Sequence, residues 1–245
     1  MRTLHLFLLF FFVSLAIQAQ DLTFYGILPA VNQTGKINSK LNYNLFISST
    51  FDCFKREIDG QNYPATDLQF YFQPSLILNP SKRVNIALSY TYQRNNPLRT
   101  VFVNKHRLWQ QVTFVESYKK IKVSNRFRFE ERFIENKATG DYPLSTRLRY
   151  QLDFSIPLKM KNNHGFYLHT SNEFYFSLTG QKNALYSENW AYLALGWTIR
   201  KNQKLEFGYL NQILVRDHLK DFRILNLLHI SWVTNFQFHR IIIEK

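Results

Sequence analysis

Most of this chain consists of long segments in which apolar and polar residues alternate one by one. Between residues 83 and 93, every even position is valine, isoleucine, leucine or tyrosine, and every odd position is polar or small. Successive side chains of a β-strand point to opposite faces, so this pattern predicts a strand with one apolar and one polar face. The same alternation recurs along the chain, which therefore belongs to the all-β class.

The predicted strands are too long for an ordinary soluble sheet. They run to roughly 10 to 14 residues, whereas globular strands are mostly about 5 to 6 and a tilted strand needs about 9 to 11 to cross a bilayer. With residues 83–93, the predicted strands are 41–48, 67–78, 106–117, 123–133, 147–156, 165–177, 188–199, 204–215 and 222–236. We therefore predict a transmembrane antiparallel up-and-down β-barrel.

The predicted connections alternate between short and long. Short polar turns fall at residues 79–82, 118–120, 159–164 and 200–203, and mostly longer connections fall between them. Bacterial outer-membrane barrels alternate in this way between periplasmic turns and external loops. We predict about ten strands, an even number that places both ends on the periplasmic side. Residues 21–36 are either an extra strand, which together with one further unidentified strand makes about twelve, or a periplasmic or plugging arm.

The start of the chain indicates export. Arg2 precedes an apolar run over residues 6–17, and Ala19 stands before Gln20. The run is shorter than the ~20 residues that a membrane helix needs, so we interpret residues 1–19 as a cleaved signal peptide and residues 20–245 as the barrel domain. This predicts a location in the outer membrane of the cell.

Composition narrows the functional classes. Aromatic residues make up 17% of the chain, which excludes a disordered tail, and the single cysteine, Cys53, excludes an internal disulfide framework. No spacing predicts a metal site or a cofactor. The formal charge of +14 is spread over strands and turns, so we expect contact with outer-membrane lipid headgroups and no nucleic-acid partner.

The polar faces of the predicted strands carry many charged residues. A soluble barrel would place these charges outside, whereas a membrane barrel places them in a wet lumen, and strand length favours the second arrangement. Symmetric hairpins put Glu130 opposite Arg149 and Arg126 opposite Asp153, then bring Arg149 near Glu173 and Asp153 near His169. The predicted lumen ion-pair network is Arg126, Arg128, Glu130, Arg132, Arg147, Arg149, Asp153, His169 and Glu173.

This network has two interpretations. The ion pairs either fill and rigidify a narrow barrel, as in a structural or surface-interaction protein, or they line a porin-like, narrow or gated transport channel for a small solute. We favour the filled lumen.

An enzymatic alternative rests on three residues of neighbouring strands. Asp153, His169 and Ser171 share the lumen face. An acid, a histidine and a serine close together form the arrangement used in nucleophilic catalysis. A lumen crowded with arginine offers no evident acyl-chain site, so we expect no enzyme here and only a structural contact between the aspartate and the histidine.

Several short motifs resemble one family. They are residues 125–133 (NRFRFEERF), 147–150 (RLRY), 172–174 (NEF), 188–190 (ENW), 196–197 (GW) and 206–210 (EFGYL). Together they look like the signature segments of an uncharacterised family of Gram-negative outer-membrane β-barrels, a domain of unknown function. The resemblance implies an outer-membrane barrel with lipid and the barrel-insertion machinery as partners, and it supplies no activity.

Overall fold

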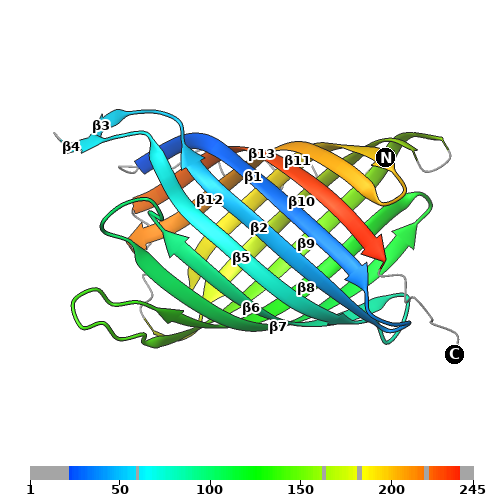
Figure 1. Cartoon of the computed structure of the whole chain (residues 1–245), viewed down its shortest axis with the longest axis horizontal. Helices are drawn as coiled ribbons and strands as arrows, with labels where there is room; N and C mark the ends of the chain where they lie inside the picture. Colours follow the sequence, from blue (N-terminus) through cyan, green and yellow to red (C-terminus); the bar gives the residue numbers. More distant parts are fainter. Residues whose placement is uncertain (1–21, 59–60, 162–163, 181–183, 218–220, 238–245) are drawn as a thin grey trace, which may run out of the picture.

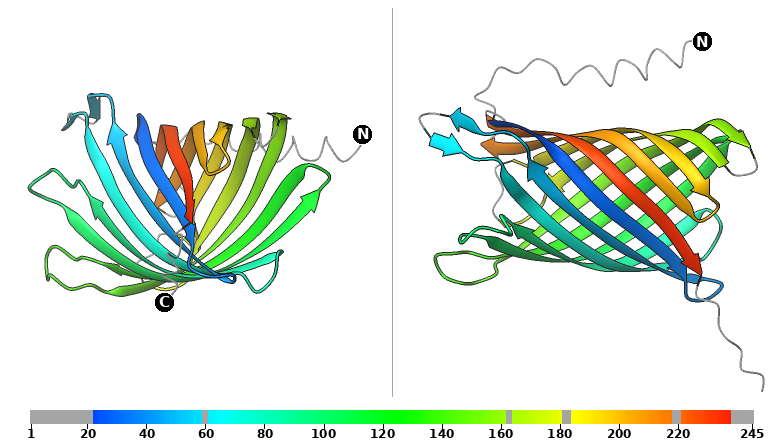
Figure 2. Two further views of the ribbon diagram at one scale, coloured as in Figure 1. Left: turned by 45° about the vertical axis from the view of Figure 1, so that its right-hand side comes forward. Right: turned by 45° about the horizontal axis from the view of Figure 1, so that its top comes forward.

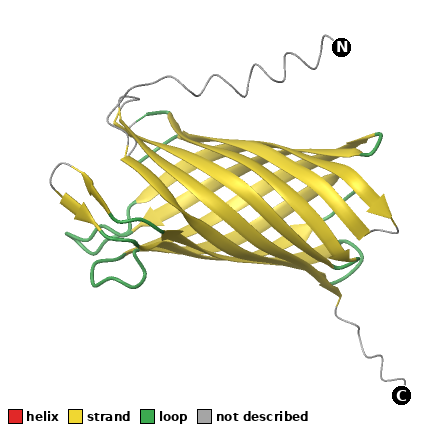
Figure 3. Cartoon of the chain, turned by 90° about the horizontal axis from the view of Figure 1, so that it is seen from above, coloured by secondary structure: helices red, strands yellow, loops and turns green. Residues whose placement is uncertain are grey.

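The protein is a closed β-barrel in the computed structural model, which describes residues 22–58, 61–161, 164–180, 184–217 and 221–237. The predicted signal peptide, residues 1–19, lies outside these residues. Within the described segments, eleven strands form the wall, and their strong tilt is plain in Figure 1 and Figure 3. The strands are β1 (Leu22–Lys36), β2 (Leu41–Asp52), β5 (Thr66–Leu78), β6 (Val84–Asn95), β7 (Val103–Tyr118), β8 (Ile121–Ile134), β9 (Leu144–Lys161), β10 (His164–Ser177), β11 (Tyr186–Arg200), β12 (Gln203–Asp217) and β13 (Asp221–Gln237).

The predicted all-β, up-and-down barrel is confirmed, with one more strand than the predicted ten. From β2 to β13, consecutive wall strands pair antiparallel. The short hairpin of β3 (Arg56–Ile58) and β4 (Gln61–Tyr63) stands apart from the wall in the connection between β2 and β5. No helix in the described part of the chain has the length and apolarity to cross a membrane.

The extra strand is β1, and it closes the barrel. It pairs antiparallel with β2 and parallel with β13, from Leu22 opposite Arg223 to Lys36 opposite Gln237. Figure 2 shows these two strands, blue and red, running side by side in the same direction. The start of β1 and the end of β13 therefore lie at opposite ends of the barrel, so the expectation of an even strand number with both ends on one side is wrong.

Each end of the barrel carries one kind of connection. At the end where β1 finishes, the strands are joined by short turns, such as residues 119–120 between β7 and β8. At the other end lie the longer connections, such as residues 53–65, 96–102 and 135–143. We call these the short-turn end and the long-loop end.

The barrel exposes apolar side chains on its outer surface and buries polar side chains in its interior. Leu88, Leu193 and Leu228 are 56%, 46% and 51% exposed on its outer surface. Thr91, Glu130 and Arg147 are 0%, 0% and 2% exposed in its interior. The alternating pattern thus places its apolar face outward and its polar face inward.

Part of the interior is nevertheless apolar. Phe24, Leu28, Leu210, Leu225 and Leu227 pack together on the inner faces of β1, β12 and β13. Because β1 is apolar on both faces, with Tyr25 and Ile27 exposed outside, its sequence does not alternate and does not reveal a wall strand.

Prolines coincide with irregularities in the ladder. The β1–β2 pairing is interrupted between Ile27 and Ala30, around Pro29, and the β5–β6 pairing between Phe72 and Ser75, around Pro74. Proline has no backbone N–H to donate to a neighbouring strand, so it removes a ladder hydrogen bond. The wall is therefore locally less tightly bonded at these two positions.

Candidate functional site in the barrel lumen

The inner faces of β8 to β11 carry the largest group of interacting charges. Alternation points every second residue of a strand into the lumen, and here several of these positions are arginine or glutamate. We call this group the belt; it comprises Arg126, Arg128, Glu130, Arg147, Arg149, Glu173 and Glu188.

Glu130 is the centre of the belt. Its Oε2 accepts hydrogen bonds from Arg147 Nε at 3.0 Å and Nη2 at 2.7 Å, and its Oε1 accepts one from Arg149 Nη1 at 2.5 Å. Arg147 also reaches Glu188 at 2.6 Å across to β11. Arginine forks bind carboxylates strongly in such geometry, so the side chains cross-link three strands inside the barrel.

Glu173 holds the other side of the belt. Arg149 donates to both of its carboxylate oxygens at 2.8 Å, and Arg126 Nη2 donates at 2.5 Å. Tyr175 is fully buried next to it and lies under the guanidinium groups of Arg147 and Arg149, whose Cζ atoms are 4.6 Å and 4.3 Å from the ring centroid. Cation–π contacts of this kind add to the ion pairs when solvent is excluded.

The structure brings together most of the residues predicted for the network, in partly different pairs. Glu130 contacts Arg149, and Arg149 contacts Glu173, as expected. Arg126, expected opposite Asp153, instead lies opposite Gln151 and pairs with Glu173. The pairing of Arg126 with Asp153 is therefore wrong.

The register explains this difference. Glu130 pairs with Arg147 across the backbone, not with Arg149, so the β8–β9 ladder is displaced by two residues from the symmetric hairpin. A slip of two residues keeps every side chain on its own face. Arg149 still reaches Glu130 because diagonal neighbours lie within the reach of a long side chain.

Arg128 and Arg132 interact less with carboxylates. Arg128 donates from Nε and Nη2 to Gln111 Oε1 at 3.0 Å and 2.8 Å, and its Cζ lies 3.8 Å from the Trp109 ring centroid. Arg132 lies opposite Ser145, and among the described residues no carboxylate forms a salt bridge with it. The belt itself contains four arginines and three glutamates, and Arg132 adds a further arginine beside it.

A second polar cluster lies nearer the short-turn end. His169 Nε2 is 2.5 Å from Asp153 Oδ2, and its Nδ1 is 3.2 Å from Glu206 Oε1. Glu206 also accepts hydrogen bonds from the hydroxyls of Tyr167 at 2.7 Å and Tyr192 at 3.2 Å. His169 and Asp153 thus meet as expected, but within a larger cluster that is separate from the belt.

This cluster does not have the geometry of a catalytic triad. Both ring nitrogens of His169 face carboxylates, and among the described residues no hydrogen bond joins His169 to Ser171. A general base needs a free lone pair directed at the serine hydroxyl. The arrangement supports a structural role for these residues.

A cavity of about 360 Å³ lies in the lumen beside the belt. Arg107, Arg126, Arg128, Arg149 and Glu173 line it on one side. The residues that line it from other strands include Leu28, Phe46, Trp190 and Leu210. Its volume falls at the small end of the range found for ligand pockets, roughly 300 to 1,000 Å³.

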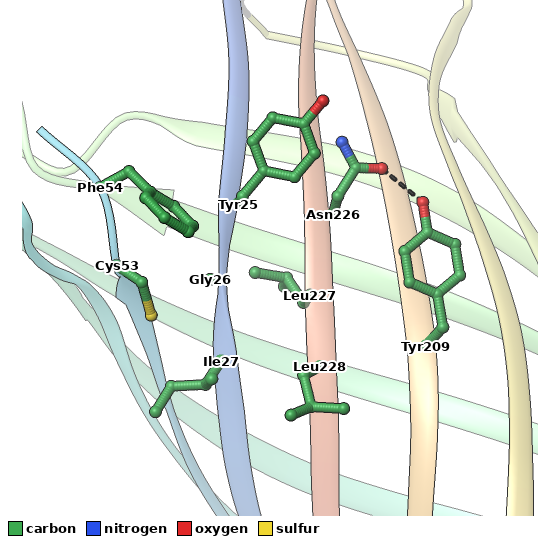
Figure 4. A pocket seen from close by; sticks show the side chains of 9 residues that line it. All are labelled: Tyr25, Gly26, Ile27, Cys53, Phe54, Tyr209, Asn226, Leu227 and Leu228. Carbon is green, nitrogen blue, oxygen red and sulfur yellow. Dashed lines mark hydrogen bonds between the residues drawn. The ribbon is translucent and has the colours of Figure 1, made fainter. Parts of the chain in front are cut away.

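A second hollow lies on the outer surface, over the seam between β1 and β13. It is an open groove of about 590 Å³, and Figure 4 shows Tyr25 and Ile27 of β1, Phe54 after β2 and Leu228 of β13 around it. The Tyr209 hydroxyl donates to the Asn226 side-chain oxygen at its edge. The lone thiol of the chain, Cys53, is exposed beside this groove.

One loop carboxylate is held by a specific pair of donors. Glu135, just after β8, accepts the backbone N–H of Asn104 at 2.8 Å and Lys137 Nζ at 2.7 Å. The hydrogen bond from Lys137, followed by that from Asn104, holds the pKa of Glu135 below its ordinary value. The interaction connects the long loop 135–143 to the start of β7.

The predicted ion-pair network leaves out several residues of the site. Glu188 completes the belt, Glu206 anchors the second cluster, and Arg107 lines the cavity. Inward parity along each strand would identify all three, since they sit on the same face as other lumen residues. In the described part of the chain, no group of three or more His, Cys, Asp or Glu residues is placed to hold a metal ion.

The fold and interior define the class of protein: a closed β-barrel with an ion-paired polar lumen and an apolar outer surface. Residues 30–223 match the family described as "Protein of unknown function (DUF2490)". The match covers more than half of the chain, which therefore belongs to this family. Neither the curated proteins nor the solved structures gave a match. The expectation of an uncharacterised β-barrel family is thus confirmed.

Proposed function

We propose that the protein is an integral outer-membrane β-barrel whose lumen is closed to ions at rest. The observation that carries this proposal is the inverted polarity of a closed sheet. Apolar side chains such as Leu88, Leu193, Phe207 and Leu228 are exposed around the wall, while glutamate and arginine are buried inside. Soluble monomers rarely expose apolar patches beyond a few hundred Å², whereas lipid requires such a surface.

Strand length and aromatic placement support the membrane. The wall strands contain 12 to 18 residues, enough for the ~9 to 11 that a tilted strand needs to cross hydrocarbon. Trp197 and Trp232 are exposed on the outer surface near the short-turn end, and Tyr25 is exposed near the long-loop end. Aromatic residues favour the two interfaces of a membrane. Outer-membrane lipid and the barrel-insertion machinery are the partners that this proposal implies.

The belt supports a closed lumen. Glu130 and Arg147 are buried and bonded to each other, and Tyr175 is buried against Arg147 and Arg149. These side chains extend from β8, β9 and β10 into the interior, and none of them is exposed as it would be on the wall of a wide aqueous pore. A barrel near this strand number has an interior that side chains can fill.

A narrow, gated channel for a small solute is the second candidate. The observation in its favour is the cavity of about 360 Å³ beside the belt, which gives a solute room inside the lumen. In this case the ion pairs of the belt would have to separate for passage.

Planar-bilayer recording tests the proposal. The purified protein should first show a gel mobility that changes on boiling, which demonstrates a folded barrel. We expect no discrete conductance from the wild type, and Arg149→Ala, which breaks contacts to Glu130 and Glu173, should introduce current steps or noise. Discrete, charge-selective steps from the wild type, shifted in Arg149→Ala, would instead establish the channel.

A further inference from the structure

We propose that the lumen cavity is a binding site for a small organic anion with an apolar body, such as an aryl or alkyl carboxylate or phosphate. This inference goes beyond a closed membrane barrel and does not depend on whether the belt opens. It rests on the charge of one wall of the cavity, on buried donors without acceptors, and on apolar side chains in the opposite wall.

The charged wall has a surplus of positive charge. Four arginines, Arg107, Arg126, Arg128 and Arg149, line the cavity, and the only carboxylate among the described lining residues is Glu173. Even when Glu130, which binds Arg149 from outside the lining, is included, arginines outnumber carboxylates by four to two. Uncompensated buried charge is costly, so this wall favours an anion.

Several donors on the lining residues are buried without an acceptor. They are Arg107 Nε, Arg126 Nε and Trp190 Nε1, for which the described part of the chain provides no hydrogen-bond partner. Arg107 is only 8% exposed, and its Nη2 is already bonded to Gln93 Oε1. A buried donor without an acceptor costs about 1 to 3 kcal/mol, which a carboxylate or phosphate oxygen in the cavity would recover.

Two of the arginines that line the cavity are oriented by neighbouring side chains. Arg128 is fixed by Gln111 and stacked on Trp109, and Arg107 lies with its Cζ 5.8 Å from the Tyr71 ring centroid. A guanidinium that is oriented before binding loses little conformational entropy when the ligand arrives. These contacts therefore lower the entropy cost of binding an anion.

The wall across the lumen is partly apolar, and we call it the apolar wall; the amide side chains of Asn32 and Asn44 line the cavity beside its apolar residues. Leu28 on β1 and Leu210 on β12 line the cavity and belong to the apolar interior cluster, and Phe46 on β2 packs against that cluster. In the order of strands around the barrel, β1 lies opposite β8, with β13 to β9 on one side and β2 to β7 on the other. A ligand that contacts both walls must therefore carry its charge at one end and an apolar group at the other.

Calorimetric titration of the detergent-solubilised, folded barrel tests this inference. The probes are 2-naphthoate and 2-naphthyl phosphate, with neutral 2-naphthylmethanol and acetate as controls, each corrected for partition into empty micelles. We expect saturable binding of at least one naphthyl anion, and the preferred one identifies the head group. Absence of saturable binding for both anions, or equal binding of 2-naphthylmethanol, would overturn the proposal, and binding of acetate as tight as that of the naphthyl anions would overturn the role of the apolar wall.

Variants connect the binding to named residues. Arg107→Gln should weaken binding by roughly 10- to 100-fold, the loss of a charge-assisted hydrogen bond. Arg126→Gln provides the same test if Arg107→Gln fails to fold, because the Arg126 side chain is 23% exposed and therefore less buried than Arg107. Arg99→Gln, in the exposed connection 96–102, is the matched control and should leave the affinity unchanged. Equal affinities in folded Arg107→Gln or Arg126→Gln and in the control would contradict the assignment.

Discussion

Replacement of Glu130 by glutamine provides a quantitative test of the belt. The carboxylate is completely buried and accepts hydrogen bonds from two arginines, at 2.5 Å, 2.7 Å and 3.0 Å, with Arg128 Nη1 at 3.7 Å. Removing one partner from a buried ion pair typically costs about 3 to 5 kcal/mol. Because glutamine keeps one acceptor oxygen, we expect a loss of about 3 kcal/mol, which lowers the melting temperature of a chain of this size by roughly 6 to 12 °C.

Thermal unfolding in detergent micelles, followed by circular dichroism and by the boiling-dependent gel shift, measures this loss. The matched control is Glu131→Gln, the adjacent residue on the opposite face, for which no ion pair is found in the described segments. Its substitution should be neutral within about 0.5 kcal/mol or slightly stabilising. A Glu130→Gln barrel that melts within 2 °C of the wild type, or a control that loses as much, would refute the stabilising role of the belt.

Three further predictions concern other parts of the barrel. Gly196→Ala should lose about 1 to 3 kcal/mol because its new methyl group collides with the Tyr167 ring, and Tyr167→Ala in the same chain should make the glycine substitution harmless; chemical denaturation of the two single variants and the double variant decides this. Glu135 should titrate below the ordinary 4.5 of a glutamate, so that the attachment of its loop is complete above pH 4.5 and is lost as the pH falls through the lowered pKa; a carboxyl carbon NMR titration at or above 4.5 would contradict this. Exposed Cys53 at the long-loop end should react with a membrane-impermeant maleimide on intact Gram-negative cells, whereas Lys119→Cys in a Cys53→Ser background, at the short-turn end, should not; this expects the long loops to face outward, and the opposite result would contradict it.

The alternating pattern predicted the antiparallel part of the wall because each of those strands separates an apolar from a polar environment. The strand β1 could not be found in this way. Its inner residues Phe24 and Leu28 pack on an apolar interior cluster, while Tyr25 and Ile27 face outward, so both faces are apolar. Periodicity reports a difference between two environments, and it disappears where the two sides are alike.

The sequence predicted which charged residues face the lumen better than it predicted which of them form ion pairs with one another. Inward parity follows from the period of a strand, but the register of each hairpin depends on the conformation of its loop. The loop 135–143 closes two residues away from a symmetric hairpin, and this replaced the expected Arg126–Asp153 pair with Arg126–Glu173. The cavity could not be predicted at all, since it depends on which strands stand opposite each other across the lumen.

The parallel seam between β1 and β13 determines how this barrel can assemble. Every other ladder joins wall strands that are successive along the chain, but this one pairs Leu22 with Arg223, nearly the whole described length of the chain apart. Contacts of such high sequence separation form slowly because loop-closure entropy must be lost before they stabilise anything. Until β13 is present, one edge of β1 has no neighbouring strand, and its apolar inner face lacks Leu225 and Leu227. The wall can therefore grow hairpin by hairpin, but it becomes edge-free only in a final step that joins its first strand to its last.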